Sequence, residues 1–457
     1  MIVKVASFCS GIRVTGAAPS ALRSFACALA GASALIALAA HPVPLSASQE
    51  QYGPVADPVT DAPLQPAPDE IPQELVDAVV RALDQSPLVL AGLAEVAALQ
   101  SDLRTARWQR YPNVSAEILA GTGGSNAADA DGFAVNVALE QPIWSGGGIG
   151  SQIDAARFNR DVGRNSLREV RSNIQLAIIS SYFEALRAFE RARVLEEGIE
   201  EHRALVARIE RRVIAEVSPL ADLTLARSRL TQLEVELTTA RELGANAMLR
   251  LSEFVGSDVP MPVFPEGDIT QELPVEVVAL QEMMSCSPGM DRLRSEIDVA
   301  EAQVRTTRSA LFPQLLLQLS QNEITGARAA IVLRAQTGNG LSRLSAVDSA
   351  EARVDQAVAE LGQADREART RLSGEYVVLR SSQLRGEAGR QASEAAGSLL
   401  ASYQRQFMAG RRSWLDVLNA AREMTNANVA VSDARVSTAA SATRILALSC
   451  RWRPLGV

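Results

Sequence analysis

Apolar residues recur in steps of three and four over two long stretches that contain no proline. The first stretch runs from residue 149 to residue 217, and the second runs from residue 341 to residue 407. This spacing is typical of one face of a helix. At about 1.5 Å per residue, each stretch would span roughly 100 Å as a single helix. In the first stretch, two apolar stripes rich in small residues predict a helix with neighbours on both sides. The stripes are Ile174, Ile178, Ser181, Ala185, Ala188, Ala192, Leu195 and Ile199, and Leu176, Ile179, Phe183 and Leu186.

A returning helix is expected after each long stretch. The first returning segment starts with Ser218 as the expected N-cap and Pro219 as the expected first helical residue. The second follows the break "AGRRS" at residues 409–413. When Asp222 is aligned with Asp416, both segments continue with apolar residues and an Ala-Arg pair. Together with the similar helix lengths and proline positions, this match indicates an internal duplication.

Two short strands are expected before each long helix. Pro112 and Pro313 should end the preceding helices, the second of which is expected from about Val275 to Leu311, and should turn the backbone to an extended conformation. Alternation of apolar and polar residues then predicts strands in "FAVNVALEQPIW" and "RAAIVLRAQ". Each is about 8 to 10 residues long, which matches a tilted strand that spans a membrane.

The alternation assigns one face of these strands to lipid and the other to a lumen. The residues expected to face lipid are Phe133, Val135, Val137, Leu139, Ile331 and Leu333. Asn136, Glu140 and Arg334 then face the lumen. A soluble hairpin packed on the helices is the alternative. The glycines of "SGGGIG" and "TGNG" would let the chain turn from the strands into the long helices.

Four amphipathic strands cannot close a barrel, and open sheet edges are not tolerated in lipid. Other copies of the chain must therefore complete the sheet. Three copies would supply twelve strands, a reasonable number for a barrel. The fold expected is mainly α with a small β part. It is a trimeric α-barrel tunnel with a 12-stranded membrane β-barrel, four strands from each chain, and an internal two-fold structural repeat.

The N-terminal region has the order of a secretory signal. A basic stretch precedes the uncharged apolar segment at residues 25–40, which contains an A-x-A pattern and is shorter than a spanning helix. A buried helix is the alternative. The expected segments are a signal peptide at 1–40, a Pro-rich disordered lead-in at 41–72, repeat 1 at 73–256, a linker at 257–274, repeat 2 at 275–451 and a short tail at 452–457.

Composition narrows the possible functions. The chain has 457 residues and a net charge of −8, whereas a protein that holds a phosphate backbone carries a basic excess. Nucleic acid is therefore not an expected partner. The four cysteines are not in paired spacings, so we expect neither a metal site nor a disulfide framework, and buried free thiols are the default. No catalytic or cofactor-binding residue is assigned, because "SGGGIG" alone is a weak phosphate-loop motif. We expect no enzymatic activity.

Two motifs carry a resemblance to a known family. "QPIWSGGG" precedes the first long helix, and "AGRRSWLDVLNAARE" forms the second tip. With the duplicated plan, they make residues 72 to 451 resemble the TolC family of outer-membrane efflux and secretion channels. The resemblance implies a homotrimer in the outer membrane of a Gram-negative bacterium, with its helical part in the periplasm. A periplasmic adaptor (membrane fusion) protein and an inner-membrane RND or ABC pump would complete the path.

The resemblance also implies roles for the two tips. The adaptor-docking residues would be Ala215, Glu216, Val217, Ala409, Gly410 and Arg411, and the periplasmic gate residues would be Asp222, Phe407, Arg412, Asp416 and Asn419. Asp222 and Arg412 would link neighbouring helix pairs in the closed state, and Asp416 would face the lumen. Glu216 stands where the family usually has Gly, and Asn419 where it usually has a second Asp. Charged residues that merely decorate solvated helix ends are the alternative.

The function expected is a passive outer-membrane conduit of a tripartite efflux or type I secretion system. The alternative is a periplasmic or extracellular coiled-coil scaffold without a channel. A scaffold would account for the helices but not for the paired strands or the Gly-rich turns after them. The cargo is left open, because a conduit of this kind leaves the choice of cargo mainly to its pump.

Overall fold

The computed structural model describes residues 66–121, 132–322, 326–336 and 338–453. The expected signal peptide and most of the lead-in lie outside the described residues. All described elements belong to one compact unit, Thr60–Val457.

The elements of this unit fall into two series with the same order. The first comprises α2 (Gln73–Gln85), α3 (Pro87–Trp108), β1 (Asn113–Gly121), β2 (Gly132–Trp144), α4 (Gly148–Ile214) and α5 (Leu220–Val255). The second comprises α6 (Glu276–Cys286), α7 (Pro288–Ser309), β3 (Gln314–Asn322), β4 (Gly326–Arg334), α8 (Ser342–Met408) and α9 (Trp414–Leu448). The short 3-10 helix η1 (Ile269–Glu272) lies between them.

The two series confirm the internal duplication. Helices α4 and α8 each have 67 residues, α3 and α7 each have 22, and β1 and β3 each have 9. A constant offset of 194 residues relates Gly148 to Ser342 at the starts of the long helices and Leu220 to Trp414 at the starts of the returning helices. The chain therefore builds the same supersecondary unit twice.

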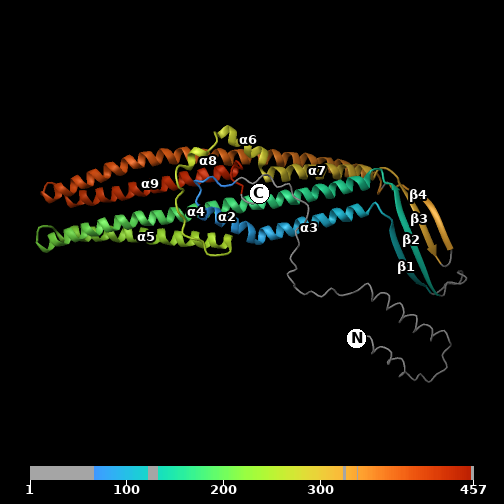
Figure 1. The fold of residues 1–457 in the computed structure, drawn as a ribbon, viewed down its shortest axis with the longest axis horizontal. Coiled ribbons are helices and arrows are strands. Elements are labelled where there is room, and N and C mark those ends of the chain that lie inside the picture. Colours follow the sequence, from blue (N-terminus) through green and yellow to red (C-terminus); the bar gives the residue numbers. More distant parts are fainter. Residues whose placement is uncertain (1–65, 122–131, 323–325, 337, 454–457) are drawn as a thin grey trace, which may run out of the picture. The chain divides into compact units, whose positions relative to one another are not determined.

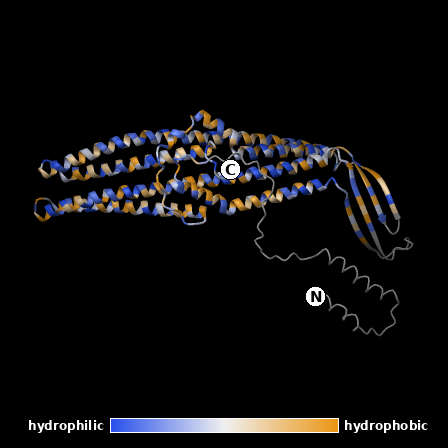
Figure 2. Ribbon diagram, in the orientation of Figure 1, coloured by the Kyte–Doolittle hydropathy of each residue, from blue (hydrophilic) through white to orange (hydrophobic). Residues whose placement is uncertain are grey.

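The four long helices form two antiparallel hairpins, α4–α5 and α8–α9, and α4 also contacts α9 (Figure 1). The sheet lies at one end of these helices and the two tip turns lie at the other. The largest apolar cluster joins α2, α4, α9 and the linker, and a second cluster lies near the tips. Apolar and polar residues are mixed along every long helix (Figure 2), as expected for helices with more than one neighbour.

The helices that precede the strands differ from the prediction. In place of one helix from about Val275 to Leu311, the chain forms α6 and α7, which are separated at Ser287. Ser86 separates α2 from α3 in the same way. Each serine is extended, and a proline follows as the first helical residue. Proline suits the first helical position because the N–H group there has no partner within the helix. Inside one continuous helix, the missing N–H group of proline would remove a hydrogen bond.

The N-cap expected for the first returning helix is wrong by one residue. Pro219 is the N-cap of α5, and its extended backbone (ψ 150°) delays the helix to Leu220. Ser218 instead accepts a hydrogen bond at its Oγ from Nε of Arg212 at 3.3 Å. Ser413, in contrast, is a true N-cap of α9, since its Oγ accepts from the backbone N–H of Asp416 at 3.2 Å.

The expectation of free thiols is also wrong. Cys286, the last residue of α6, forms a disulfide with Cys450, which follows α9. The two residues are 164 positions apart in sequence, and their Cα atoms are 6.5 Å apart. The bond joins the two boundaries of a segment that contains α7, β3, β4, α8 and α9. Beside it, Arg451 forms two hydrogen bonds of 2.9 Å with the carboxylate of Glu282.

Two buried tyrosines fix the linker between the repeats. Tyr182 on α4 donates to the carbonyl oxygen of Val263 at 3.0 Å and accepts from its backbone N–H at 2.9 Å. Tyr376 on α8 donates to the carbonyl oxygen of Pro274 at 2.6 Å. The same 194-residue offset relates the two tyrosines, so equivalent positions of the two repeats hold the two parts of the linker. Burial raises the pKa of each phenol to about 12.

Residues at both margins of the described chain belong to the core. Ile71, within the segment expected as a lead-in, is 4% exposed, and Trp452, within the segment expected as a tail, is 1% exposed. Nε2 of Gln175 on α4 donates to the carbonyl oxygen of Trp452 at 3.2 Å. The packed unit therefore includes part of each of these two segments.

Candidate functional site

The four strands form one antiparallel sheet in the order β1-β2-β3-β4. Ala116 pairs with Val137, Leu139 with Leu319, and Leu317 with Ile331. Because residues that pair directly lie on the same face of a sheet, these pairs place the expected lipid-facing residues of β2 and β4 on one face.

This apolar face is open in the chain. Val114, Ile118, Ile331 and Leu333 are each about two-thirds exposed, and Val137 is 41% exposed. Leu139 is half-buried. Phe133 and Val135 occupy the same register row of β2, but their side chains lie outside the described part of the chain. A contiguous apolar face of this kind is unfavourable in water and must contact other apolar groups. The sequence predicts that these groups are lipid.

The opposite face carries the charged residues and most of the polar ones. Asn113 pairs with Glu140, Glu140 with Gln318, and Gln314 with Arg334. Oε2 of Glu140 accepts from Nε2 of Gln318 at 2.8 Å, and the two carboxylate oxygens of Glu140 accept from Arg334 at 3.3 and 3.4 Å. The structure therefore brings the predicted lumen residues Glu140 and Arg334 together across three strands.

Exposed aromatic residues gather where the helices meet the sheet. Trp108 and Tyr111 lie with their ring centroids 5.0 Å apart, and Trp144 and Phe312 lie 6.4 Å apart. Between 48% and 67% of each residue is exposed. Aromatic side chains of this kind mark the membrane–water boundary of outer-membrane barrels. The sequence predicts that Pro112 and Pro313 end the preceding helices but does not predict this group, because its Trp144–Phe312 contact forms only when the two repeats come together.

The junction also explains the glycines of "SGGGIG". Gly146 has φ +61°, and a Cβ atom there would lie 2.9 Å from Cβ of Phe312. The turn into α4 therefore requires both the backbone freedom and the small size of glycine.

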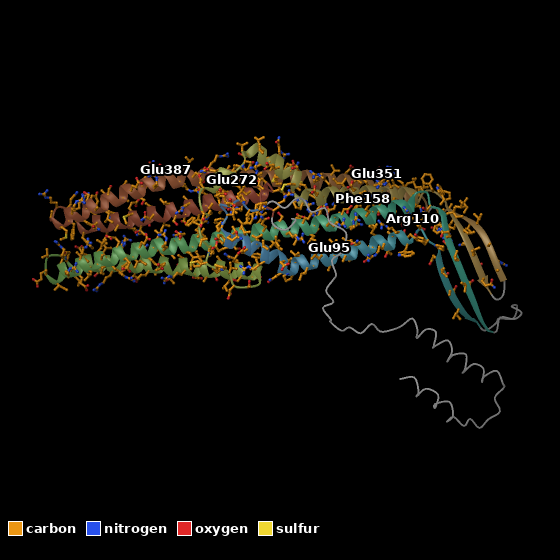
Figure 3. All side chains as sticks on the ribbon, in the orientation of Figure 1. Glu95, Arg110, Phe158, Glu272, Glu351 and Glu387 are labelled. Atoms are coloured by element: carbon orange, nitrogen blue, oxygen red, sulfur yellow. A yellow bond between two sulfur atoms is a disulfide. The ribbon has the colours of Figure 1, made fainter. Side chains whose placement is uncertain are left out.

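A side-chain hydrogen bond links the end of β2 to the segment before β1 at this junction. Nε2 of Gln141 on β2 donates to the carbonyl oxygen of Arg110, just before β1, at 3.0 Å (Figure 3 labels Arg110).

The two tip turns have the same backbone hydrogen bonds. At the end of α4, the N–H of Glu216 binds the carbonyl of Val213, and the N–H of Val217 binds that of Arg212. At the end of α8, Gly410 and Arg411 form the equivalent bonds. This is a Schellman motif, which needs a left-handed residue after the helix. Glu216 adopts φ 58° and Gly410 adopts φ 69°, so Glu216 takes the glycine conformation.

An aromatic cluster joins the two hairpins near the tips. Phe407 at the end of α8 is 7% exposed and packs against Trp414, with ring centroids 5.0 Å apart. The guanidinium carbon of Arg212, on α4, lies 4.7 Å from the centroid of the Phe407 ring. This cation–π contact links α4 to α8. Nothing in the spacing of Arg212 sets it apart from the other arginines of α4, so the sequence does not predict this contact.

Of the expected gate residues, the structure brings Arg412 and Asp416 together. Nε of Arg412 lies 3.6 Å from Oδ2 of Asp416, and the Arg412 guanidinium carbon lies 4.0 Å from the ring centroid of Tyr403. Asp222 lies in the first turn of α5. Within the described chain, no ion pair joins it to Arg412, so their contact stays a prediction. Asn419 is exposed on α9.

The ends of the two hairpins are exposed. All six expected docking residues are exposed: Ala215, Glu216, Val217, Ala409, Gly410 and Arg411. Apolar side chains in and beside the turns are exposed as well: Ile214 77%, Val217 61%, Leu220 67%, Met408 69% and Leu415 48%. Apolar surface that is grouped in this way marks an interaction site more often than scattered residues do.

The described residues contain neither a candidate metal site nor a single helix that could span a membrane. No group of three or more His, Cys, Asp or Glu side chains could hold a metal ion in the ranges that the structure covers. No single helix in those ranges is long and apolar enough to cross a membrane, although α2 and α3, bent by 44°, meet the length and composition criteria together.

Comparison with known proteins places this geometry in context. The family model described as "Outer membrane efflux protein" matches residues 78–257 and 279–449. The cobalt-zinc-cadmium resistance protein CzcC of Cupriavidus metallidurans is 30% identical over 189 residues, which cover 41% of this chain and 45% of that relative. The chain therefore spans less than half of the length of this relative. Protein CyaE of Bordetella pertussis is 24% identical over 359 residues, 73% of this chain and 75% of the relative.

Solved structures share the fold. A structure of CusC, solved to follow conformational changes in folding and transmembrane channel formation, aligns with a TM-score of 0.73 at 16% identity, over 85% of this chain and 99% of CusC. The two parts of the family match coincide with the two series of elements and leave out the linker between them.

Proposed function

Because this chain belongs to the outer membrane efflux protein family, we propose that three copies form one conduit across the outer membrane and the periplasm. The chain is the outer-membrane channel component of a tripartite efflux or type I secretion system. The observation that supports the trimer most directly is the four-stranded sheet, with one apolar face, one polar face and two unpaired edges. Such a sheet needs other copies before it can lie in lipid.

Members of this family form homotrimeric channels that work with a periplasmic adaptor and an inner-membrane pump. For this chain, we propose docking of the adaptor at the exposed tip turns. The apolar residues Val217 and Met408 would supply buried contact area. Glu216 adds a carboxylate at a backbone position that otherwise has the glycine geometry, so the partner adaptor should present a polar or cationic group there.

The proposed partners are an adaptor and a pump of the RND or ABC class, and the proposed cargo is whatever that pump selects. CzcC is by name a cobalt-zinc-cadmium resistance protein, and metal cations are one candidate cargo for this chain. The family and the fold are those of channel proteins, and we propose that the chain has no catalytic activity. A coiled-coil scaffold would leave the sheet and its aromatic margin without a role.

Cell fractionation and bilayer recording test the channel. The purified full chain should come from outer-membrane fractions as a heat-modifiable trimer and should conduct ions in planar bilayers. A monomer in the soluble fraction that gives no conductance would contradict the proposal.

At the periplasmic end, we propose a gate that includes Asp222, Phe407, Arg412 and Asp416. Arg412 is held between Asp416 and the ring of Tyr403, and it would bind Asp222 of a neighbouring helix pair in the closed state. An exposed ion pair contributes only about 0.2 to 1 kcal/mol. Three such pairs, together with the Phe407 cluster, can bias the channel toward the closed state.

Single-channel conductance tests the gate. Arg412→Ser, alone and with Asp222→Ala, should raise the conductance, because the link between helix pairs is lost. Asp416→Asn should weaken block by divalent or trivalent cations, since a lumen-facing ring of carboxylates attracts them. Arg411→Ser is the matched control, because Arg411 is exposed in the same turn. Wild-type conductance and block in all variants would show that the gate lies elsewhere.

A further inference from the structure

The polar face of the sheet carries two charges that have no partner among the residues that the structure describes. Glu140 and Arg334 neutralise one another on this face. Glu117 on β1 and Arg328 on β4 are also on it, as their pairing with Asn136 and Ser320 shows. Both side chains are exposed, and neither forms a hydrogen bond or an ion pair among the described residues.

These two charges lie on the two edges of the sheet. The strand order places β1 at one edge and β4 at the other (Figure 1), and the backbone groups of each edge strand are paired on one side only. Neighbouring strands alternate in direction, so β4 of one copy can pair with β1 of another copy in the antiparallel sense. Both strands have nine residues.

Side-chain alternation restricts the register of this pairing. A shift by one residue would move the polar residues of one copy to the apolar face of the next, so only even steps are allowed. The register in which the two strands overlap fully, with Asn113 opposite Arg334 and Gly121 opposite Gly326, meets this requirement. It places Glu117 opposite Ala330. Arg328 is then the diagonal neighbour of Glu117, at a separation that a long side chain can reach.

We propose that Glu117 of one subunit and Arg328 of the next form an ion pair across each seam of the barrel, on the lumen side. The proposal rests on the proposed trimeric channel. Three such pairs would neutralise the only charges on the polar face of the described strands that lack a partner within their own chain. The seam pair therefore contributes to assembly and removes a source of ion selectivity from the lumen.

Disulfide crosslinking tests the register. In the full chain, Glu117→Cys with Ala330→Cys, the residue directly opposite it in this register, should give covalent dimers and trimers on non-reducing gels after mild oxidation, because directly opposed residues lie close enough for a disulfide. Glu117→Cys with Arg334→Cys is the control and should give none, because Arg334 would lie opposite Asn113, four positions from the residue opposite Glu117. Crosslinking of the control pair alone, or of neither pair in an intact trimer, would overturn the seam pair and leave the channel standing. Failure to form any trimer would instead contradict the proposed function.

Charge reversal tests the interaction itself. Glu117→Arg alone and Arg328→Glu alone should each lower the temperature at which the trimer dissociates in detergent. The double reversal should restore it. The single variants should also shift the cation–anion preference of the channel in opposite directions. Single variants with wild-type dissociation temperature and ion preference would show that the two charges do not interact.

Discussion

At the scale of single residues, the two tip turns adopt the same backbone geometry with different residues. Glu216 and Gly410 close equivalent helices with the same hydrogen bonds and with φ values of 58° and 69°. A residue with a Cβ atom costs roughly 1 to 2 kcal/mol in this conformation, whereas glycine adopts it without steric cost. The backbone of the first turn is therefore strained at Glu216, whereas that of the second turn is not strained at Gly410.

We expect Glu216→Gly to stabilise the first tip by about 1 kcal/mol, because the left-handed backbone is already formed and the Cβ strain is removed. Gly410→Glu, the matched exchange in the other turn, should destabilise the second tip by a similar amount. Hydrogen exchange of peptides from the two tips measures both changes. Equal protection in the wild type and both variants would show that the strain is absent.

The two linker tyrosines predict an alkaline transition. Burial raises the pKa of Tyr182 and Tyr376 to about 12, above the usual value of about 10 for tyrosine. A raised pKa in the folded state means that these groups stabilise the fold fully below pH of about 10, and that this contribution is lost as the pH rises through about 12.

The measurement is the free energy of unfolding against pH, followed together with the ultraviolet absorbance of tyrosinate. Tyr182→Phe should lower stability at neutral pH, because the backbone N–H and carbonyl of Val263 lose their hydrogen-bond partner, at about 0.5 to 1.5 kcal/mol per hydrogen bond. The same variant should make the alkaline loss smaller. An alkaline loss of unchanged size would assign the transition to other groups.

At the scale of elements, the strands and long helices could be predicted because one period runs through each of them. Alternation fixed both the extent of β2 and its faces, and the absence of proline limited α4 and α8 to within a few residues. The Ser-Pro breaks before α3 and α7 were missed for a physical reason. Proline suits the first turn of a helix as well as its end, so its meaning depends on the backbone of the preceding serine.

The apolar sheet face gives a prediction at this scale. Ile331→Arg should disrupt barrel assembly, because a cation on the lipid face costs about 2 to 4 kcal/mol near the bilayer midplane. Ala330→Arg, on the neighbouring residue of the polar face, should assemble. The yield of heat-modifiable trimer in membrane extracts measures both variants. If the two variants assembled equally well, the soluble-hairpin alternative would regain support.

At the scale of the whole molecule, the disulfide is a constraint that sequence spacing could not reveal. Cys286 and Cys450 meet only because α6 and the end of α9 pack at the same level of the fold, 164 residues apart along the chain. The Arg212–Phe407 contact was missed for the same reason. The duplicated order of elements and the tip motif could be predicted from the sequence. Contacts between the repeats could not, because they depend on how the two hairpins pack against each other.

Removal of the disulfide should destabilise the protein by up to about 5 kcal/mol, the chain-entropy value for a loop of this length. Cys286→Ser, Cys450→Ser and the double variant should lose similar amounts, since each opens the same loop. Chemical unfolding of the detergent-solubilised protein with and without a reductant provides the measurement. A thiol assay on the unreduced, unfolded chain without residues 1–40, which contain Cys9 and Cys27, should find no free thiol, and two free thiols per chain would contradict the bond.

The position of this disulfide also predicts when it can form. In a chain exported from its N-terminus, as the signal peptide expected at residues 1–40 implies, Cys286 would emerge before α7, and Cys450 only after α9. The segment between the two cysteines would therefore have no crosslink during export, and the disulfide could close this loop only after α9 has emerged. The disulfide can therefore form only in a full-length chain, because a chain truncated before the end of α9 lacks Cys450 and leaves Cys286 without a partner thiol.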